Sequence, residues 1–275
     1  MKKVSILVVT YGIDLIESLS LIAISNLDLR NIDYKPVLKI WMNKYSDENI
    51  YLNEEIKDKF EIEIVKSLEN KALPIIYNRF LLEQDSDYAI LLDQDSIIED
   101  DYISEINQVI NDMNVYLLLP KVVHGDTLVS PGRLRLFFGT LDPTLKDRKG
   151  IIKDRDIVAI NSGLVVKVEL VKKDIIKYDE RLKFYFTDTK FLLDYNKLGF
   201  GIYLLESVIS HDLSELSDSN NTSRASVRFS DMVFGFRATY PNGVLRILLE
   251  SYLVYVAVKY SIKFKSYIFL KLLVG

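Results

Sequence analysis

The sequence predicts an α/β protein whose core is a mostly parallel sheet flanked by helices. Short apolar runs typical of buried strands alternate with segments whose apolar residues recur at helical spacing. Such alternation is the pattern of parallel sheets, because the crossovers between parallel strands place helices on both faces. A chain of 275 residues with 49% hydrophobic residues is long enough for one large domain, or for a domain with an appendage.

The first half of the chain carries the clearest alternation. Each expected strand is an apolar run bounded by polar or turn residues, and Pro74 is tolerable in the first turn of a helix. Acidic residues from Glu99 to Asp101 favour a helix N-terminus there. The predicted strands are Val4–Val9, Val37–Met42, Glu61–Val65, Ala89–Leu92 and Tyr116–Leu119, and the predicted helices are Ile13–Leu27, Ala72–Leu82 and Asp100–Met113.

The alternation ends near Pro120. Prolines, glycines and mixed charges up to Arg155 predict loops or short antiparallel pieces. Beyond them the chain again contains candidate elements, with strands at Val158–Ile160, Leu164–Val166 and Ile202–Leu205, and helices at Glu169–Ile176 and from about Asp188 to Leu198.

The last sixty residues have a different character. Ser217–Ser226 is rich in Ser and Asn and is expected to be a mobile loop or linker. From Val244 the chain is strongly apolar, with four lysines interleaved with aromatic residues, and no uninterrupted apolar run reaches the roughly 18 residues of a membrane-spanning helix. This mixture predicts a C-terminal helical extension, residues 216–275, that lies in a membrane interface. A helical hairpin packed on the domain at 1–215 is the alternative.

Composition excludes several classes of function. The formal net charge of −4 argues against general nucleic-acid binding, which requires a basic face. Without cysteine there is no disulfide, thiolate zinc site or cysteine nucleophile, which suits a reducing cytoplasm. The N-terminal apolar run is too short for a signal peptide. Neither a phosphate-binding glycine loop nor a hydrolase nucleophile elbow occurs in the chain.

Two carboxylates follow the most apolar of the predicted strands. Asp93 and Asp95 come where Ala89–Leu92 ends, and in an extended backbone their side chains would share one side. Ligands of α/β proteins bind at this edge of a parallel sheet, and a hard divalent cation carrying a diphosphate would relieve the repulsion between the carboxylates. A metal site and a helix-capping turn are both compatible with the position.

Two later residues are candidates for chemistry. Asp188 follows the aromatic run Phe184–Phe186 at the expected start of a helix, where it is either a favourable helix-terminal charge or a general base in a partly dry cleft. His211 follows the strand predicted at Ile202–Leu205, and a lone histidine is structural more often than it is a ligand. His124 is assigned no role.

The order of these features resembles a known family. Thr10-Tyr11 after the first strand, Leu92-Asp-Gln-Asp-Ser96, Asn161-Ser-Gly163, an aromatic run with Asp188, and a late His211 are similar to bacterial family 2 glycosyltransferases of the GT-A fold, closest to the rhamnosyltransferase branch. The resemblance covers roughly residues 3 to 215. It implies a nucleotide-sugar half at about 1–100 and an acceptor half at about 101–215.

The resemblance also implies roles for individual residues. Asp188 would be the catalytic base, and Asp95 and His211 would bind Mn²⁺ or Mg²⁺. Asn161, Ser162 and Gly163 would lie on the acceptor side. Segment 70–74 lacks the family's usual glycine, and Thr187-Asp188-Thr189-Lys190 replaces its usual acidic pair. The residues implied to bind the nucleotide-sugar donor are Thr10, Tyr11, Asn43, Asn70, Asn78, Asp93 and Gln94.

These expectations lead to one main reading of function. It is a metal-dependent inverting glycosyltransferase that moves rhamnose from dTDP-rhamnose, or a hexose from a UDP-sugar, to a lipid-linked or growing saccharide of a bacterial surface polysaccharide. The enzyme would work in the cytoplasm, on the inner face of the plasma membrane, and its assembly into homo-oligomers is left open. A catalytically silent nucleotide-sugar-binding scaffold of a polysaccharide complex is the second reading. A nucleotidyltransferase ranks last, because residues 10–14 are a poor triphosphate-binding loop.

Overall fold

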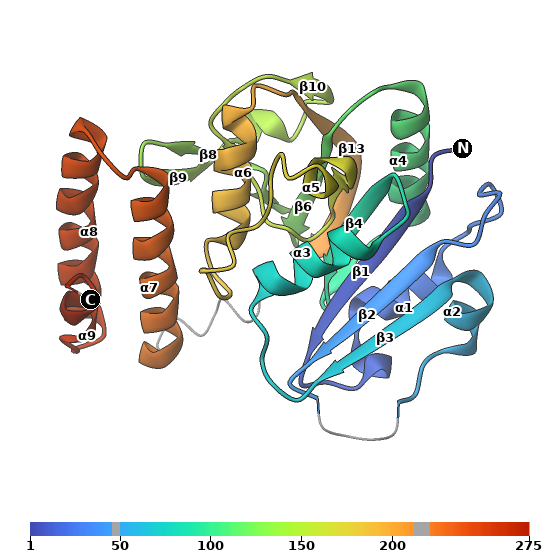
Figure 1. The fold of residues 1–275 in the computed structure, drawn as a ribbon, viewed down its shortest axis with the longest axis horizontal. Coiled ribbons are helices and arrows are strands. Elements are labelled where there is room, and N and C mark those ends of the chain that lie inside the picture. Colours follow the sequence, from blue (N-terminus) through green and yellow to red (C-terminus); the bar gives the residue numbers. More distant parts are fainter. Residues whose placement is uncertain (46–49, 212–220, 275) are drawn as a thin grey trace.

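The computed structural model describes residues 1–45, 50–211 and 221–274 (Figure 1). Within these residues a ten-stranded sheet has the order β10-β13-β6-β12-β4-β1-β2-β3, with β5 paired to β13 and β7 to β6. Neighbours from β4 to β3 are parallel, whereas β12 is antiparallel to both β4 and β6. The strands of this sheet are β1 Val4–Tyr11, β2 Val37–Asn43, β3 Glu61–Ser67, β4 Tyr88–Asp93, β5 Ser96–Ile97, β6 Leu117–His124, β7 Thr127–Ser130, β10 Gly150–Ile152, β12 Leu164–Lys167 and β13 Ile202–His211.

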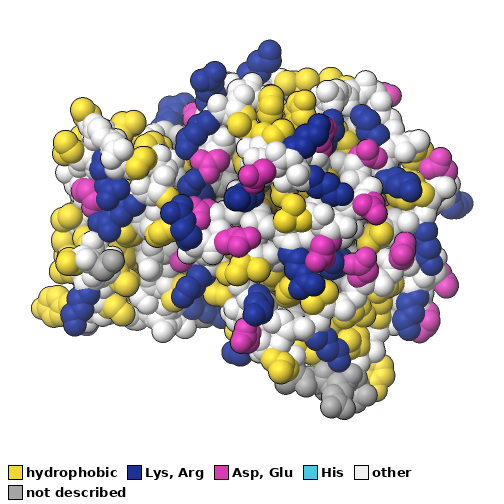
Figure 2. Space-filling model, viewed as in Figure 1, with side chains coloured by type: hydrophobic (Ala, Val, Ile, Leu, Met, Phe, Trp, Pro, Cys, Tyr) yellow, Lys and Arg dark blue, Asp and Glu magenta, His cyan; other side chains and the backbone are white. Residues whose placement is uncertain are grey.

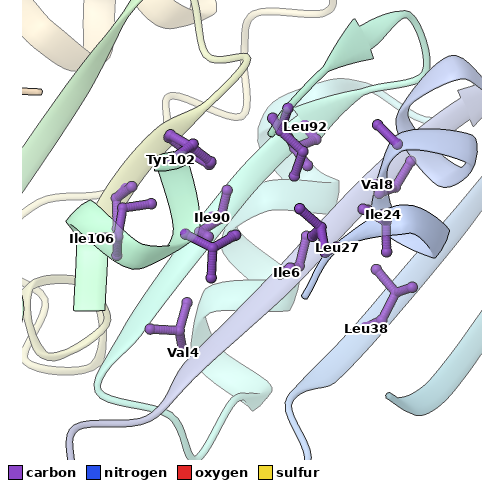
Figure 3. Packing of buried hydrophobic residues seen from close by; sticks show 14 of the residues in the cluster. Val4, Ile6, Val8, Ile24, Leu27, Leu38, Ile90, Leu92, Tyr102 and Ile106 are labelled. Atoms are coloured by element: carbon purple, nitrogen blue, oxygen red, sulfur yellow. The ribbon is translucent and has the colours of Figure 1, made fainter. Parts of the chain in front are cut away.

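Side-chain alternation along the strands builds a hydrophobic layer on each face of the sheet. In β1, Ile6 and Val8 point into one cluster, and Leu7 and Val9 point into the other. Figure 3 shows the first cluster, where β1 and β4 meet α1 and α4. Helices α1 (Leu19–Asn26), α2 (Glu54–Lys59) and α4 (Asp100–Asp112) cover that face, and α3 (Leu73–Glu83), α5 (Glu169–Lys172) and α6 (Thr187–Lys197) cover the other. The predicted α/β class is confirmed.

Several predicted elements differ in extent from the observed ones. The helix expected at Ile13–Leu27 is a 3-10 turn, η1 (Leu15–Glu17), followed by α1. It breaks because Ser18 is extended and its hydroxyl caps α1 by accepting the Leu21 N–H. The helix expected to reach Ile176 ends at Lys172, and Asp174 has a left-handed φ of 52°. Ser46 and Asp47, in the polar segment that follows β2, lie outside the described residues.

The region from Pro120 to Arg155 contains short antiparallel strands, as predicted. A separate three-stranded sheet has the order β11-β8-β9, formed by Ile157–Val158, Gly132–Arg135 and Phe138–Leu141, and η2 spans Pro143–Leu145. Arg133 joins its segments through ion pairs of 2.5 Å to Asp142, 3.2 Å to Asp154 and 2.6 Å to Asp156. Because the Arg133 side chain is only 13% exposed, these pairs are screened less than surface pairs are.

The C-terminal helices pack on the rest of the molecule. Figure 1 shows α7 (Thr222–Thr239) and α8 (Val244–Lys263) running antiparallel, with α9 (Ile268–Lys271) at the end of α8. Their buried residues form a third hydrophobic cluster with Leu134, Phe137 and Leu193. The loop expected at Ser217–Ser226 is wrong from Thr222 onward, where α7 begins, and its earlier part lies outside the described residues. Among the described helices, none combines the length and apolar character needed to cross a bilayer.

Candidate active site

Polar residues from several strands meet at one edge of the sheet. The parallel register pairs Tyr11 at the end of β1 with Asn43 at the end of β2, and Val9 with Asp93 at the end of β4. Since β12 runs antiparallel to β4, the segment just before it also lies at this edge. β13 reaches the same edge because it extends beyond the predicted Leu205 to His211, which pairs with Ser96 of β5.

Asp93, Asp95 and His211 form a group able to hold a metal ion. One ligand atom from each lies within 4.8 Å of the others, and His211 Nδ1 is 3.4 Å from Asp95 Oδ1. The two aspartates are half-buried and His211 is buried. The extended backbone expected across Asp93–Asp95 is wrong, since Gln94 and Asp95 form a turn, but that turn still brings both carboxylates to His211. Two carboxylates and an imidazole suit a hard or borderline divalent cation such as Mg²⁺ or Mn²⁺.

Three serine hydroxyls hold this turn in place. Ser96 Oγ lies 2.9 Å from His211 Nδ1 and also contacts Ser162 Oγ. Ser162 Oγ accepts the Asp93 N–H at 3.1 Å, and Ser20 Oγ accepts the Ser96 N–H at 3.0 Å. The hydroxyls therefore tie β4, β12, β13 and α1 together around the carboxylates, and Ser96 orients the ring of His211.

The Asn161–Gly163 segment can approach β4 only because position 163 is glycine. Gly163 has a φ of +81° and donates its N–H to the Leu91 carbonyl at 2.7 Å. A Cβ at this position would lie 2.2 Å from Ile209 Cδ1. Asn161 is buried and accepts a hydrogen bond of 2.8 Å from the Tyr178 hydroxyl. This predicted acceptor-side segment thus supports the turn that carries Asp93 and Asp95.

The predicted nucleotide-contacting residues lie at the ends of β1 and β2. The Tyr11 N–H donates to Gln94 Oε1 at 2.7 Å, which joins β1 to the carboxylate turn. Asn43 Nδ2 donates to Asn70 Oδ1 at 2.8 Å, and Asn43 Oδ1 accepts the Lys71 N–H at 2.8 Å. Thr10 is buried, and within the described part of the chain its hydroxyl has no hydrogen-bond partner.

Asp188 lies in the first turn of α6 and is half-buried. Burial raises the pKa of its carboxyl above the usual 3.8, while a 2.6 Å hydrogen bond from the Thr189 N–H opposes that rise. Burial also raises the pKa of the Tyr77 and Tyr178 phenols, and the charges of Asp93 and Asp188 both contribute in the same direction. Both carboxylates thus act electrostatically on the same pair of phenols.

Comparisons with known proteins identify the fold. No protein-family model matches the chain, and no curated protein sequence matches it. Solved structures do match: S. aureus TarS 1–349 has a TM-score of 0.59 at 13% identity, covering 87% of this chain and 66% of that one. The mannosyltransferase PcManGT from Pyrobaculum calidifontis, in complex with GDP-Man and Mn²⁺, has a TM-score of 0.59 at 12% identity, covering 88% and 65%. The chain has the GT-A fold.

Asn78 and His124 make contacts within this GT-A chain that were not predicted from the sequence. The side-chain amide of Asn78 is buried in α3 and bonds Tyr178 and Glu180: Nδ2 donates to the Tyr178 carbonyl and to Glu180, and Oδ1 accepts the Tyr178 N–H, each at 2.9 Å. Its donor contact stays a prediction. His124, to which no role was assigned, lies at the end of β6 with Nδ1 3.2 Å from the His211 carbonyl oxygen.

Sequence reasoning missed the serines that support this GT-A site. Ser20 and Ser96 contact each other across 76 positions of the chain, and Ser96 contacts Ser162 across 66. A small hydroxyl residue directly after the two carboxylates was the only local signal. The partners become evident once the sheet order is known.

Proposed function

We propose that this protein is a metal-dependent inverting glycosyltransferase of family 2 that uses a nucleotide-diphosphate sugar. The observation that carries the proposal is the convergence of Asp93, Asp95 and His211 at the ligand-binding edge of a GT-A sheet. Related folds support the substrate class, because one TarS structure is a complex with UDP-GlcNAc and another neighbour, GalNAc-T7, is described with UDP, GalNAc and Mn²⁺.

The donor would lie across the ends of β1, β2 and β4. Thr10 and Tyr11 would flank the nucleobase. Asn43 and Asn70 would also contact the donor nucleotide. Asp93 and Gln94 would face the ribose or the sugar. Asn78 would also contribute to donor binding. We favour dTDP-rhamnose as donor, with a UDP-hexose as the next choice. Asp95 and His211 would hold Mn²⁺ or Mg²⁺, which would offset the charge that grows on the departing nucleotide diphosphate.

Asp188 would take the proton of the acceptor hydroxyl. In the in-line displacement, the acceptor oxygen forms a bond to the anomeric carbon while the bond from that carbon to the diphosphate oxygen breaks. A carboxylate whose pKa is raised by burial holds the abstracted proton better than an exposed one does.

The acceptor would be a lipid-linked or growing saccharide of a bacterial surface polysaccharide. It would approach past Asn161, Ser162 and Gly163, which lie beside the carboxylate turn. Such an acceptor would keep the enzyme on the cytoplasmic face of the plasma membrane.

The outer face of α8 supports membrane contact. Ile247, Val254, Val258 and Ile262 lie on one side of the helix, and their exposed fractions are 70%, 49%, 43% and 73%. Figure 2 shows hydrophobic and basic side chains together along the margin where Figure 1 places α8 and α9. From Val244 onward there are five basic residues and one acidic residue, in a chain with 35 basic and 39 acidic residues overall. An apolar stripe with local positive charge matches an anionic lipid surface.

Membrane contact can be tested without truncating the chain, which would expose the third hydrophobic cluster. Ile247→Glu with Ile262→Glu should abolish flotation with vesicles that contain phosphatidylglycerol. Ile151→Glu, at a 50% exposed position on β10, is the matched control and should still float. Equal flotation of all three proteins would contradict the assignment of this face.

The catalytic proposal is tested by screening nucleotide sugars with Mn²⁺. A thermal shift should identify the nucleotide, and release of nucleotide diphosphate with a saccharide acceptor should follow for the same donor. A thermal shift without any release, for every donor and acceptor, would favour the silent scaffold. Absence of any metal-dependent shift would contradict both.

A further inference from the structure

One face of α7 lies against the segment that leads into Asp188. The residues that make these contacts are Arg228, Asp231 and Gly235, at positions i, i+3 and i+7. This spacing places them on one side of a helix. The segment they contact is Phe184–Phe186, two residues before the proposed base.

Asp231 makes the most specific of these contacts. Its side chain is buried, and its Oδ2 accepts the N–H groups of both Phe184 and Tyr185 at 3.1 Å. A buried carboxylate is costly unless its oxygens are hydrogen-bonded. The Asp231 carboxylate meets this requirement by accepting hydrogen bonds from two successive backbone amides of the loop. The Arg228 guanidinium lies over the Tyr185 ring, 4.8 Å from its centre, in a cation–π contact.

Gly235 makes room for the next residue of the loop. A Cβ at Gly235 would lie 2.1 Å from Phe186 Cδ1, so the ring of Phe186 rests directly on the helix backbone. The Phe186 ring also packs against Phe236, with centroids 4.5 Å apart. Contacts with Gly235 and Phe236 therefore restrict the orientation of the Phe186 ring.

The backbone at Phe186 explains why the loop needs support. Phe186 has a φ of 63°, in the left-handed region that side chains with a Cβ rarely adopt. Its carbonyl accepts the Lys190 N–H at 2.9 Å, so this residue sets where α6 begins. Asp188 is in the first turn of α6. The conformation of Phe186 therefore determines where the carboxylate of Asp188 lies.

We propose that Asp231 and Gly235 are positioning residues for glycosyl transfer, and that α7 is the element that sets the proposed base in place. This inference rests on the proposed role of Asp188. It makes the C-terminal helices part of the catalytic apparatus as well as a membrane contact. Neither residue lies among the donor- or metal-binding groups, so both should act on the transfer step and leave donor binding unchanged.

The test uses the full chain with Asp231→Ala and Gly235→Ala. Glu250→Gln is the matched control, because it weakens ion pairs of α8 with Arg237 and Arg246 without contacting Phe184–Phe186. We expect kcat for transfer to fall about 10- to 100-fold in the two test variants, since a displacement of about 1 Å can cost that much, with the donor KM within about twofold of wild type. The control should keep both constants.

Hydrogen exchange of the 184–189 segment separates this inference from the function on which it rests. Asp231→Ala should speed exchange there about tenfold or more, and Glu250→Gln should not. Faster exchange with unchanged kcat would overturn the positioning role, as would a fall in kcat/KM that comes entirely from a raised donor KM. A wild-type protein without transfer activity would overturn the proposed function, whereas unchanged exchange in Asp231→Ala would overturn the inference by itself.

Discussion

Replacing Asp188 by asparagine should stabilise the protein at neutral pH and nearly abolish glycosyl transfer. Burial raises the pKa of Asp188, so the folded state holds this proton more tightly than the unfolded chain does. The stability that this group contributes is thus fully present below its unfolded pKa and is lost as the pH rises through its folded pKa. Asparagine has nearly the same shape and can still accept the Thr189 N–H, but it carries no charge to desolvate.

The size of the effect follows from linkage. Each unit by which burial raises the pKa removes about 1.4 kcal/mol at a pH well above it, and 1 kcal/mol moves the melting temperature of a chain this size by about 2 to 4 °C. We therefore expect Asp188→Asn to melt a few degrees above wild type at pH 8, with the gain vanishing near pH 3. Loss of a general base should lower kcat about 10²- to 10⁴-fold. In the wild type, transfer should fall as the pH drops through the raised pKa.

The assay is thermal melting of both proteins across pH 3 to 8, beside transfer measured at pH 8. Asp194→Asn is the control on the same helix, because its carboxylate pairs with Lys190 and Lys197 and its loss should bring no gain in stability. A lower melting temperature for Asp188→Asn at pH 8, or transfer near the wild-type rate, would refute the reasoning.

Three further substitutions test the metal-binding group, the close approach at Gly163 and the ion pairs of Arg133. Asp95→Asn should weaken Mn²⁺ binding at least about tenfold, measured by the Mn²⁺-dependent thermal shift, and EDTA should stop transfer until Mn²⁺ is restored. Gly163→Ala should cost about 1 to 3 kcal/mol or more in urea unfolding, because its Cβ meets Ile209 at a φ of +81°. Gly125→Ala, at a φ of +57° but in open space, should cost less. Arg133→Met should cost about 1 to 3 kcal/mol by the same measurement, since it leaves three carboxylates without their shared cation, and a loss under about 0.5 kcal/mol would count against that role.

Features that depend on a few neighbouring residues could be predicted from the sequence. The strand before Asp93 is a short apolar run, and Tyr11 and Asn43 end two similar runs. Once these strands are assumed to be parallel, their ends must lie at one edge. The position of Asp93 at the end of β4, beside the ends of β1 and β2, was therefore predictable from the sequence, although the turn at Gln94 and Asp95 was not.

Features that depend on distant partners could not be predicted. β13 reaches His211 because Ser210 and His211 pair with Ile97 and Ser96, more than 110 positions earlier. The Ser/Asn-rich stretch predicted as a loop becomes helical at Thr222 because Asn221 caps α7, and the third cluster buries Phe229. Local composition carries no information about the pairing of β13 with β5 or about the burial of Phe229.

The antiparallel strand β12 has a consequence for how such a chain can diversify. Between His124 at the end of β6 and Leu164 at the start of β12, no strand pairs with β4 or β12: β7 and β10 pair with β6 and β13, and β8, β9 and β11 form the separate three-stranded sheet. Residues 125–160, which include the β8–β9 hairpin, therefore do not set the register of β4 or β12. Insertions, deletions and substitutions in this segment can accumulate while Gly163 and Asp93 stay in place. A descendant could thus acquire a different binding surface at this end of the molecule and inherit its carboxylate turn unaltered.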